Sequence, residues 1–142
     1  MLFRSILIRP LFLPLLAEVS GKLGQIDESI PLLDEALKIV QESEQHYIEP
    51  ELYRLKGELL LRQTVPDMVQ AATFFRQALA LACQQQAKAW ELRAAISLAR
   101  LWQQQGKRAK ARDLLAPIYG WFTEGFDTAD LQEAKALLEA LV

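Results

Sequence analysis

The clearest helical pattern of the sequence runs through residues 50–63, PELYRLKGELLLRQ, and, after a short break, through residues 67–82, DMVQAATFFRQALALA. In both segments the apolar residues recur every three or four positions, which is the spacing of one face of an α-helix. Pro50 can open the first helix, and Asp67 followed by Gln70 forms a capping-box pattern for the second. The two segments therefore predict a pair of antiparallel helices joined by a short turn.

Small residues stand where the two predicted helices should cross. Gly57 lies between Tyr53 and Leu60 on the first helix, and the second helix carries Ala71, Phe75 and Ala78. Small side chains allow two helices to approach closely, and this alternation of large, small and aromatic positions is the signature of the tetratricopeptide repeat. The pair therefore resembles one such repeat.

The same organisation extends along the whole chain. Degenerate copies of the pattern surround Ala17 and Ala99, each about 40 positions from Gly57 and so longer than the standard ~34-residue repeat. We expect an all-α, tetratricopeptide-like α-solenoid in a single domain, with units at about 10–45, 50–85 and 87–122 and a capping helix at about 128–141. The predicted helices span about 11–20, 27–42, 50–64, 67–84, 87–105, 108–119 and 128–141. Asp27 is the predicted N-cap of the second of these helices, which places Pro31 in its first turn, where a proline is tolerated.

Three segments resemble a known family. They are residues 50–63, residues 98–108 (LARLWQQQGKR) and residues 119–131 (YGWFTEGFDTADL). They are similar to the C-terminal repeats of large bacterial regulators, in which a cyclase-like or DNA-binding domain precedes a signal-transduction ATPase and a tetratricopeptide array closes the chain. The resemblance implies an interaction module, either the tail of such a regulator or a stand-alone relative. The sequence contains neither a phosphate-binding Gly-rich Lys motif nor the paired metal-binding Asp of a cyclase, so those activities do not carry over.

Composition narrows the function classes. Charged residues make up 24% of the chain with a formal net charge of −2, which excludes a strongly basic nucleic-acid binder. Cys83 is the only cysteine, so no intrachain disulfide forms, and we expect a cytoplasmic protein. The apolar N-terminus is interrupted by Arg4, Arg9, Pro10 and Pro14, and we predict neither a signal peptide nor a membrane span there.

No constellation of residues predicts catalysis, a cofactor or a metal site, and we expect no enzyme activity. His46, the single histidine, has no second histidine and no neighbouring cysteine in sequence with which to hold a metal. We interpret Cys83 as a small core residue. Asp127 and Asp130 are interpreted as capping and dipole-compensating residues of the last helix.

A binding groove is predicted on the face of the first helices that points away from their paired second helices. Helical geometry around Gly57 and Ala99 places five charged residues there, and they give this groove a net positive charge. We therefore expect a protein or peptide ligand, with acidic peptides favoured. The groove residues are Arg54, Glu58, Arg62, Arg93 and Arg100.

The two ends of the array carry further expectations. The last helix should cap a right-handed superhelix, with Trp121, Phe122 and Phe126 packed beneath it. At the other end an apolar segment should be covered by a second copy, which predicts a homodimer. The residues of that segment are Phe3, Ile6, Leu7, Leu11 and Phe12.

One alternative function stays open. The basic cluster at 107–112, made of Lys107, Arg108, Lys110 and Arg112, lies where a helix should begin, and cations are unfavourable at that end of a helix. The alternative is therefore a nucleic-acid-associated regulator that uses this cluster. Its binding to DNA would depend steeply on salt, whereas peptide capture would not.

Overall fold

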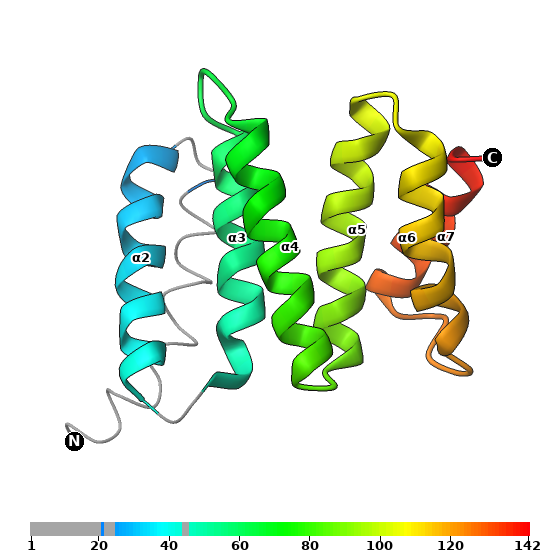
Figure 1. The fold of residues 1–142 in the computed structure, drawn as a ribbon, viewed down its shortest axis with the longest axis horizontal. Coiled ribbons are helices and arrows are strands. Elements are labelled where there is room, and N and C mark those ends of the chain that lie inside the picture. The colour runs from blue at the N-terminus through cyan, green and yellow to red at the C-terminus, as the bar shows by residue number, and fades with distance from the viewer. Residues whose placement is uncertain (1–20, 22–24, 44–45) are drawn as a thin grey trace.

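The computed structural model describes Gly21, residues 25–43 and residues 46–142. This part of the chain is helical and contains no strand, which confirms the all-α prediction. The helix expected at about 11–20 lies outside the described residues. In Figure 1 the helices lie side by side in chain order. They are α2 (Ile26–Glu42), the 3₁₀ turn η1 (His46–Ile48), α3 (Glu49–Leu61), α4 (Met68–Gln84), α5 (Lys88–Gln104), α6 (Arg108–Trp121) and α7 (Ala129–Ala140).

The helices form two rows that pack differently. Each helix packs against its neighbour in sequence, and in addition α3 contacts α5 and α5 contacts α7. No contact of comparable extent joins α2 to α4 or α4 to α6 within the described residues. We call the surface formed by α3, α5 and α7 the odd-helix face, and the surface formed by α2, α4 and α6 the even-helix face. This arrangement is compatible with a helical repeat.

Apolar residues fill the space between the rows in two clusters that meet at α3. The smaller cluster joins α2 to α3 around Leu33, Val40 and Leu52, which are fully buried. The larger one runs from α3 to α7 around Phe75 and Leu115, which are also fully buried. Together the two clusters pack the described helices against one another from α2 to α7.

Gly57 is required where α3 crosses α4. A Cβ atom at this position would lie 2.5 Å from Cε1 of Phe75 and 3.1 Å from the carbonyl oxygen of Ala71. A contact of 2.5 Å is shorter than real Cβ atoms make, and Phe75 is fully buried, so a larger residue at position 57 would force the two helices or the Phe75 ring to shift. The predicted roles of Gly57, Ala71 and Phe75 at the helix crossing are therefore confirmed.

Two turns have the same backbone geometry. After α5, the amide of Lys107 donates to the carbonyl of Trp102 at 2.8 Å, and that of Gly106 donates to Gln103 at 3.1 Å. After α4, Ala87 donates to Ala82 at 2.9 Å and Gln86 to Cys83 at 3.1 Å, which is the same Schellman pattern. The left-handed position is a glycine in one turn (Gly106, φ 78°) and a glutamine in the other (Gln86, φ 57°).

The helix starts confirm one predicted cap and correct two. Asp67 caps α4, because its carboxylate accepts a hydrogen bond from the Gln70 amide at 3.0 Å. Asp27 is not the N-cap of α2: the helix begins earlier, at Ile26 after Gln25, and Asp27 lies in the first turn.

Because α2 begins earlier than predicted, Pro31 falls in its second turn rather than in its first. Asp127 is not a cap either. Thr128 is the N-cap of α7 and accepts from the Leu131 amide at 3.4 Å, while Asp130 lies in the first turn, where a carboxylate is favourable.

The last helix packs against α5 and α6, as expected of a terminal cap, but two aromatic predictions are wrong. Trp121 is 57% exposed and Phe126 45% exposed, so neither packs beneath α7. Trp121 instead meets the edge of Phe122, and Phe126 meets Tyr119. Phe122 alone is partly buried against the core. The right-handed superhelix stays a prediction.

Within the described residues, no helix combines the length and apolar character needed to cross a bilayer.

Candidate functional site

Glu51, in the first turns of α3, is the centre of a network of ion pairs on the odd-helix face. Its carboxylate accepts hydrogen bonds from Nε and Nη2 of Arg54 at 2.9 and 2.6 Å, a two-pronged contact. Its Oε1 atom also lies 2.8 Å from Nη1 of Arg93 on α5. The side chain of Glu51 is only 8% exposed. One buried carboxylate therefore joins arginines from two neighbouring helices of the odd-helix face, α3 and α5.

The network continues from α5 to α7. Nε of Arg93 lies 3.7 Å from Oδ1 of Asp130, and Arg100 forms an ion pair with Glu133. Within the network, Nη1 of Arg54 also donates to Oγ of Ser97 at 3.4 Å. These contacts cross-link the three helices of the odd-helix face and hold their charged side chains in a fixed pattern.

The five predicted groove residues do share this face, but its charge differs from the prediction. The predicted net positive charge did not include the carboxylates of Glu51, Asp130 and Glu133. These lie on the same face, at the start of α3 and on α7. The four arginines therefore face four carboxylates, including that of Glu58, and the face as a whole is balanced.

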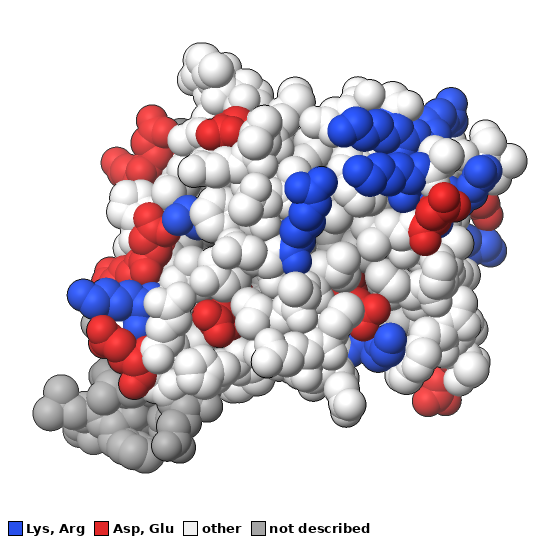
Figure 2. Space-filling model, viewed as in Figure 1, with Lys and Arg blue, Asp and Glu red and all other residues white. Residues whose placement is uncertain are grey.

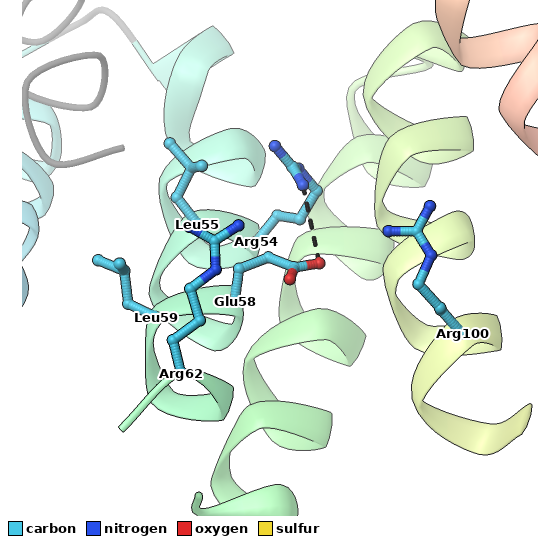
Figure 3. A pocket seen from close by; sticks show the side chains of 6 residues that line it. All are labelled: Arg54, Leu55, Glu58, Leu59, Arg62 and Arg100. Atoms are coloured by element: carbon cyan, nitrogen blue, oxygen red, sulfur yellow. Dashed lines mark ion pairs between the residues drawn. The ribbon is translucent and has the colours of Figure 1, made fainter. Parts of the chain in front are cut away.

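A hollow between α3 and α5 keeps a local excess of positive charge. Its volume is about 100 Å³. Figure 3 shows Arg54 and Glu58 converging from α3, paired at 4.0 Å, while Arg100 reaches toward them from α5. Arg62 belongs to no ion pair among the described residues. Three arginines, one glutamate and two apolar side chains make up the lining: Arg54, Arg62, Arg100, Glu58, Leu55 and Leu59.

Tyr53 lies on the other side of α3, between α2 and α4. Its ring stacks on Phe74 with centroids 6.0 Å apart, and its hydroxyl accepts a hydrogen bond from Nε2 of Gln41 at 3.2 Å. Burial, together with the nearby carboxylate of Glu49, raises the pKa of the Tyr53 phenol, although the Gln41 hydrogen bond opposes this shift. This residue holds three helices together and is no candidate for proton transfer near neutral pH.

Two residues with potentially reactive side chains, His46 and Cys83, lie apart from the odd-helix network. His46 is exposed at the start of η1, and its Nδ1 lies 3.6 Å from Oε1 of Glu49. Cys83 was predicted to be in the core, but it is exposed, because Ala78 and Ala82 occupy the buried stripe of α4 and Cys83 falls beside it. Partial burial and the neighbouring Glu91 raise the pKa of the Cys83 thiol. No group of three potential metal ligands occurs within the described residues.

The basic cluster predicted at 107–112 divides between two sides of α6. Arg108 points toward α7, where it donates to the carbonyl of Ala140 at that helix's C-terminal end. Lys110 points the other way, with Nζ 4.6 Å from the ring centroid of Trp102. Arg76 from α4 lies over the same ring at 5.9 Å. The structure thus groups Lys110 with a cation from another helix rather than with Arg108.

No family model matched the chain, and no curated protein matched it.

The network centre, Glu51, was missed by sequence reasoning. A signal was present, since Glu51 and Arg54 are three positions apart on a predicted helix and so share a face. The contacts of Asp130 and Glu133 had no such signal, because they join helices separated by a whole repeat. The predicted self-association residues, Phe3 to Phe12, lie outside the described residues.

Proposed function

We propose that this chain is a protein-interaction module of the tetratricopeptide type without catalytic activity, which binds a peptide segment on its odd-helix face. We further propose that it serves as the regulatory or sensing tail of a bacterial signal-transduction or transcription regulator in the cytoplasm. The observation that carries the proposal is the hollow lined by Arg54, Arg62 and Arg100 among apolar side chains.

The packing of the rows supports a repeat stack that curves around this face. Helices of the odd row contact one another directly, whereas those of the even row are held apart by the helices between them. A stack whose helices are closer on one side bends toward that side, and such curved stacks use the inner surface for binding. The tight Gly57–Phe75 crossing also matches the close helix pair of this repeat.

The composition of the hollow supports a carboxylate-bearing ligand. Arg54 and Arg100 are already paired to Glu58 and Glu133, but Arg62 has no carboxylate partner among the described residues. A guanidinium presents several donors that match a carboxylate, so Arg62 provides the first anchor and Arg100 the second. Leu55 and Leu59 supply an apolar contact for the neighbouring part of the ligand.

The test is a peptide-array screen followed by titration calorimetry on the selected sequences. We expect enrichment of acidic peptides, and at least a tenfold weaker affinity for the Arg62→Ala plus Arg100→Ala variant, about 1.4 kcal/mol. The matched control is Arg76→Ala plus Arg112→Ala, which removes two arginines outside the hollow and should leave affinity unchanged. Selection without acidic preference, or equal losses in both variants, would contradict the proposal.

A further inference from the structure

Charge separates along the even-helix face. The outer side of α2 carries three exposed glutamates seven positions apart, Glu28, Glu35 and Glu42, which we call the acidic stripe. Seven residues make nearly two helical turns, so these side chains lie on one line, about 10 Å apart. In Figure 2 acidic side chains dominate the surface over α2, whereas basic side chains gather toward α6.

The opposite charge is concentrated where α4 and α6 flank α5. Arg76 and Lys110 lie over the same Trp102 ring, and Lys107 precedes Lys110 by one helical turn. We call these three residues the basic patch. None of them forms an ion pair with a carboxylate within the described residues, in contrast to the paired arginines of the odd-helix face. An anionic partner can therefore bind them without displacing an existing carboxylate.

We propose that the acidic stripe of one copy docks on the basic patch of a second copy, so that the chain associates head to tail. The two surfaces lie on different helices and at different positions along the stack, so they do not overlap in one molecule. Such a contact is heterologous and extends into a row of copies, unlike a symmetric dimer, which closes on itself. This inference does not depend on what the odd-helix face binds.

A second copy fits the basic patch better than a nucleic acid does. The chain has a net charge of −2, which opposes approach to a polyanion. The patch also lacks an exposed aromatic surface for base stacking, because Trp102 is only 7% exposed and its ring already lies beneath two cations. By contrast, α2 of this chain itself carries regularly spaced exposed glutamates, which complement the charge of the basic patch, although exposed Lys38 lies between Glu35 and Glu42.

The first experiment measures mass by sedimentation velocity over a concentration series of the full chain. We expect association to weaken at least tenfold between about 20 mM and about 500 mM salt, as the Debye length falls from about 20 to about 4 Å. Neutralising the stripe (Glu28→Gln, Glu35→Gln, Glu42→Gln) should abolish it. The matched control neutralises three other exposed carboxylates, Glu124→Gln, Asp127→Asn and Glu139→Gln, and should associate normally.

The second experiment mixes two variants that cannot associate alone. The stripe-neutralised variant keeps its basic patch, and a Lys107→Gln plus Lys110→Gln variant keeps its acidic stripe. Each alone should be monomeric, while their mixture should form a 1:1 complex that grows no further, because only one complementary contact remains. A symmetric interface would not produce this pairing.

Three outcomes would overturn the proposal. One is a monomer at low salt throughout the concentration series. Another is an association that resists salt but is lost in the Phe3→Asp plus Leu7→Asp variant, which would assign it to the apolar N-terminal segment. The third is an association unchanged by Lys107→Gln plus Lys110→Gln while binding to a DNA oligonucleotide is lost, which would assign the patch to nucleic acid.

Discussion

The cations of the two faces differ in what surrounds them. On the odd-helix face Arg54 and Arg93 share the buried carboxylate of Glu51, so their positions are part of the fold. On the even-helix face Lys110 and Arg76 have an aromatic ring beneath them and no carboxylate partner in the described part of the chain. On this array, a charged side chain with a carboxylate partner on another helix locks the two helices together, whereas one without such a partner is open to a second molecule, as we propose for the basic patch.

The largest expected effect comes from the crossing that holds the two rows together. Gly57→Val should destabilise the fold by about 3 kcal/mol, because the added side chain would overlap the Phe75 ring. Gly120→Ala is the control: it also lies in a helix, nothing stands within 4 Å of its Cβ position, and it should gain up to about 1 kcal/mol. Urea unfolding followed by circular dichroism measures both. Equal stability of the two variants would mean that the rows are not held by this contact.

The next effect tests the locking role on the odd-helix face. Glu51→Gln should lower the free energy of unfolding by about 2 kcal/mol, because it leaves Arg54 and Arg93 without their shared carboxylate. This figure allows for the partial exposure of Arg93. Thermal unfolding at low and high salt provides the measurement. A variant as stable as the parent would remove the distinction between the two faces.

A smaller change of opposite sign is expected at the basic patch. Lys107→Asp should raise stability by about 1 kcal/mol, because the N-cap of α6 has no side-chain acceptor and a cation there opposes the helix dipole. The same variant should weaken self-association. Comparing unfolding curves with sedimentation data separates the two effects, and a loss of stability would show that Lys107 has a structural role.

The smallest expected effect concerns the two Schellman turns that follow α4 and α5. Gln86→Gly should stabilise the chain by about 0.5 to 1 kcal/mol, because glycine adopts the left-handed conformation without strain. The reverse substitution, Gly106→Gln, should cost a similar amount. Chemical denaturation of both variants checks whether the turns at the ends of α4 and α5 are energetically equivalent, as their hydrogen bonds indicate.

Local signals in the sequence were sufficient to predict the approximate ends of helices α3 to α7. Pro50, Asp67 and Gly106 mark helix ends through their own backbone chemistry, and the structure places those ends within a few residues of the prediction. Burial was harder to predict where a helix ends: Cys83 and Trp121 follow apolar neighbours in sequence but fall beside the buried stripe. Apolar character alone does not fix the rotation of a helix end.

The charge of the candidate site could be predicted only in part. Spacing on one helix placed Arg54, Glu58 and Arg62 together, and it could also have paired Glu51 with Arg54. The pairing of Arg93 with Asp130 depends on how α5 and α7 pack, which no local pattern specifies. The sequence therefore did not predict that positive and negative charges balance on the odd-helix face.

Packing in chain order has a consequence for how the chain folds. Because most contacts join helices that follow one another, little chain entropy is lost before a new helix finds its partner, and folding rates rise with such short-range contacts. Each added helix pair can then form on the edge of the pairs already assembled, in the way that growth proceeds along a one-dimensional array. The Gly57 crossing belongs to the most extensive helix pair of the described residues, α3 with α4, so we expect folding to begin there and the ends of the stack to open and close first.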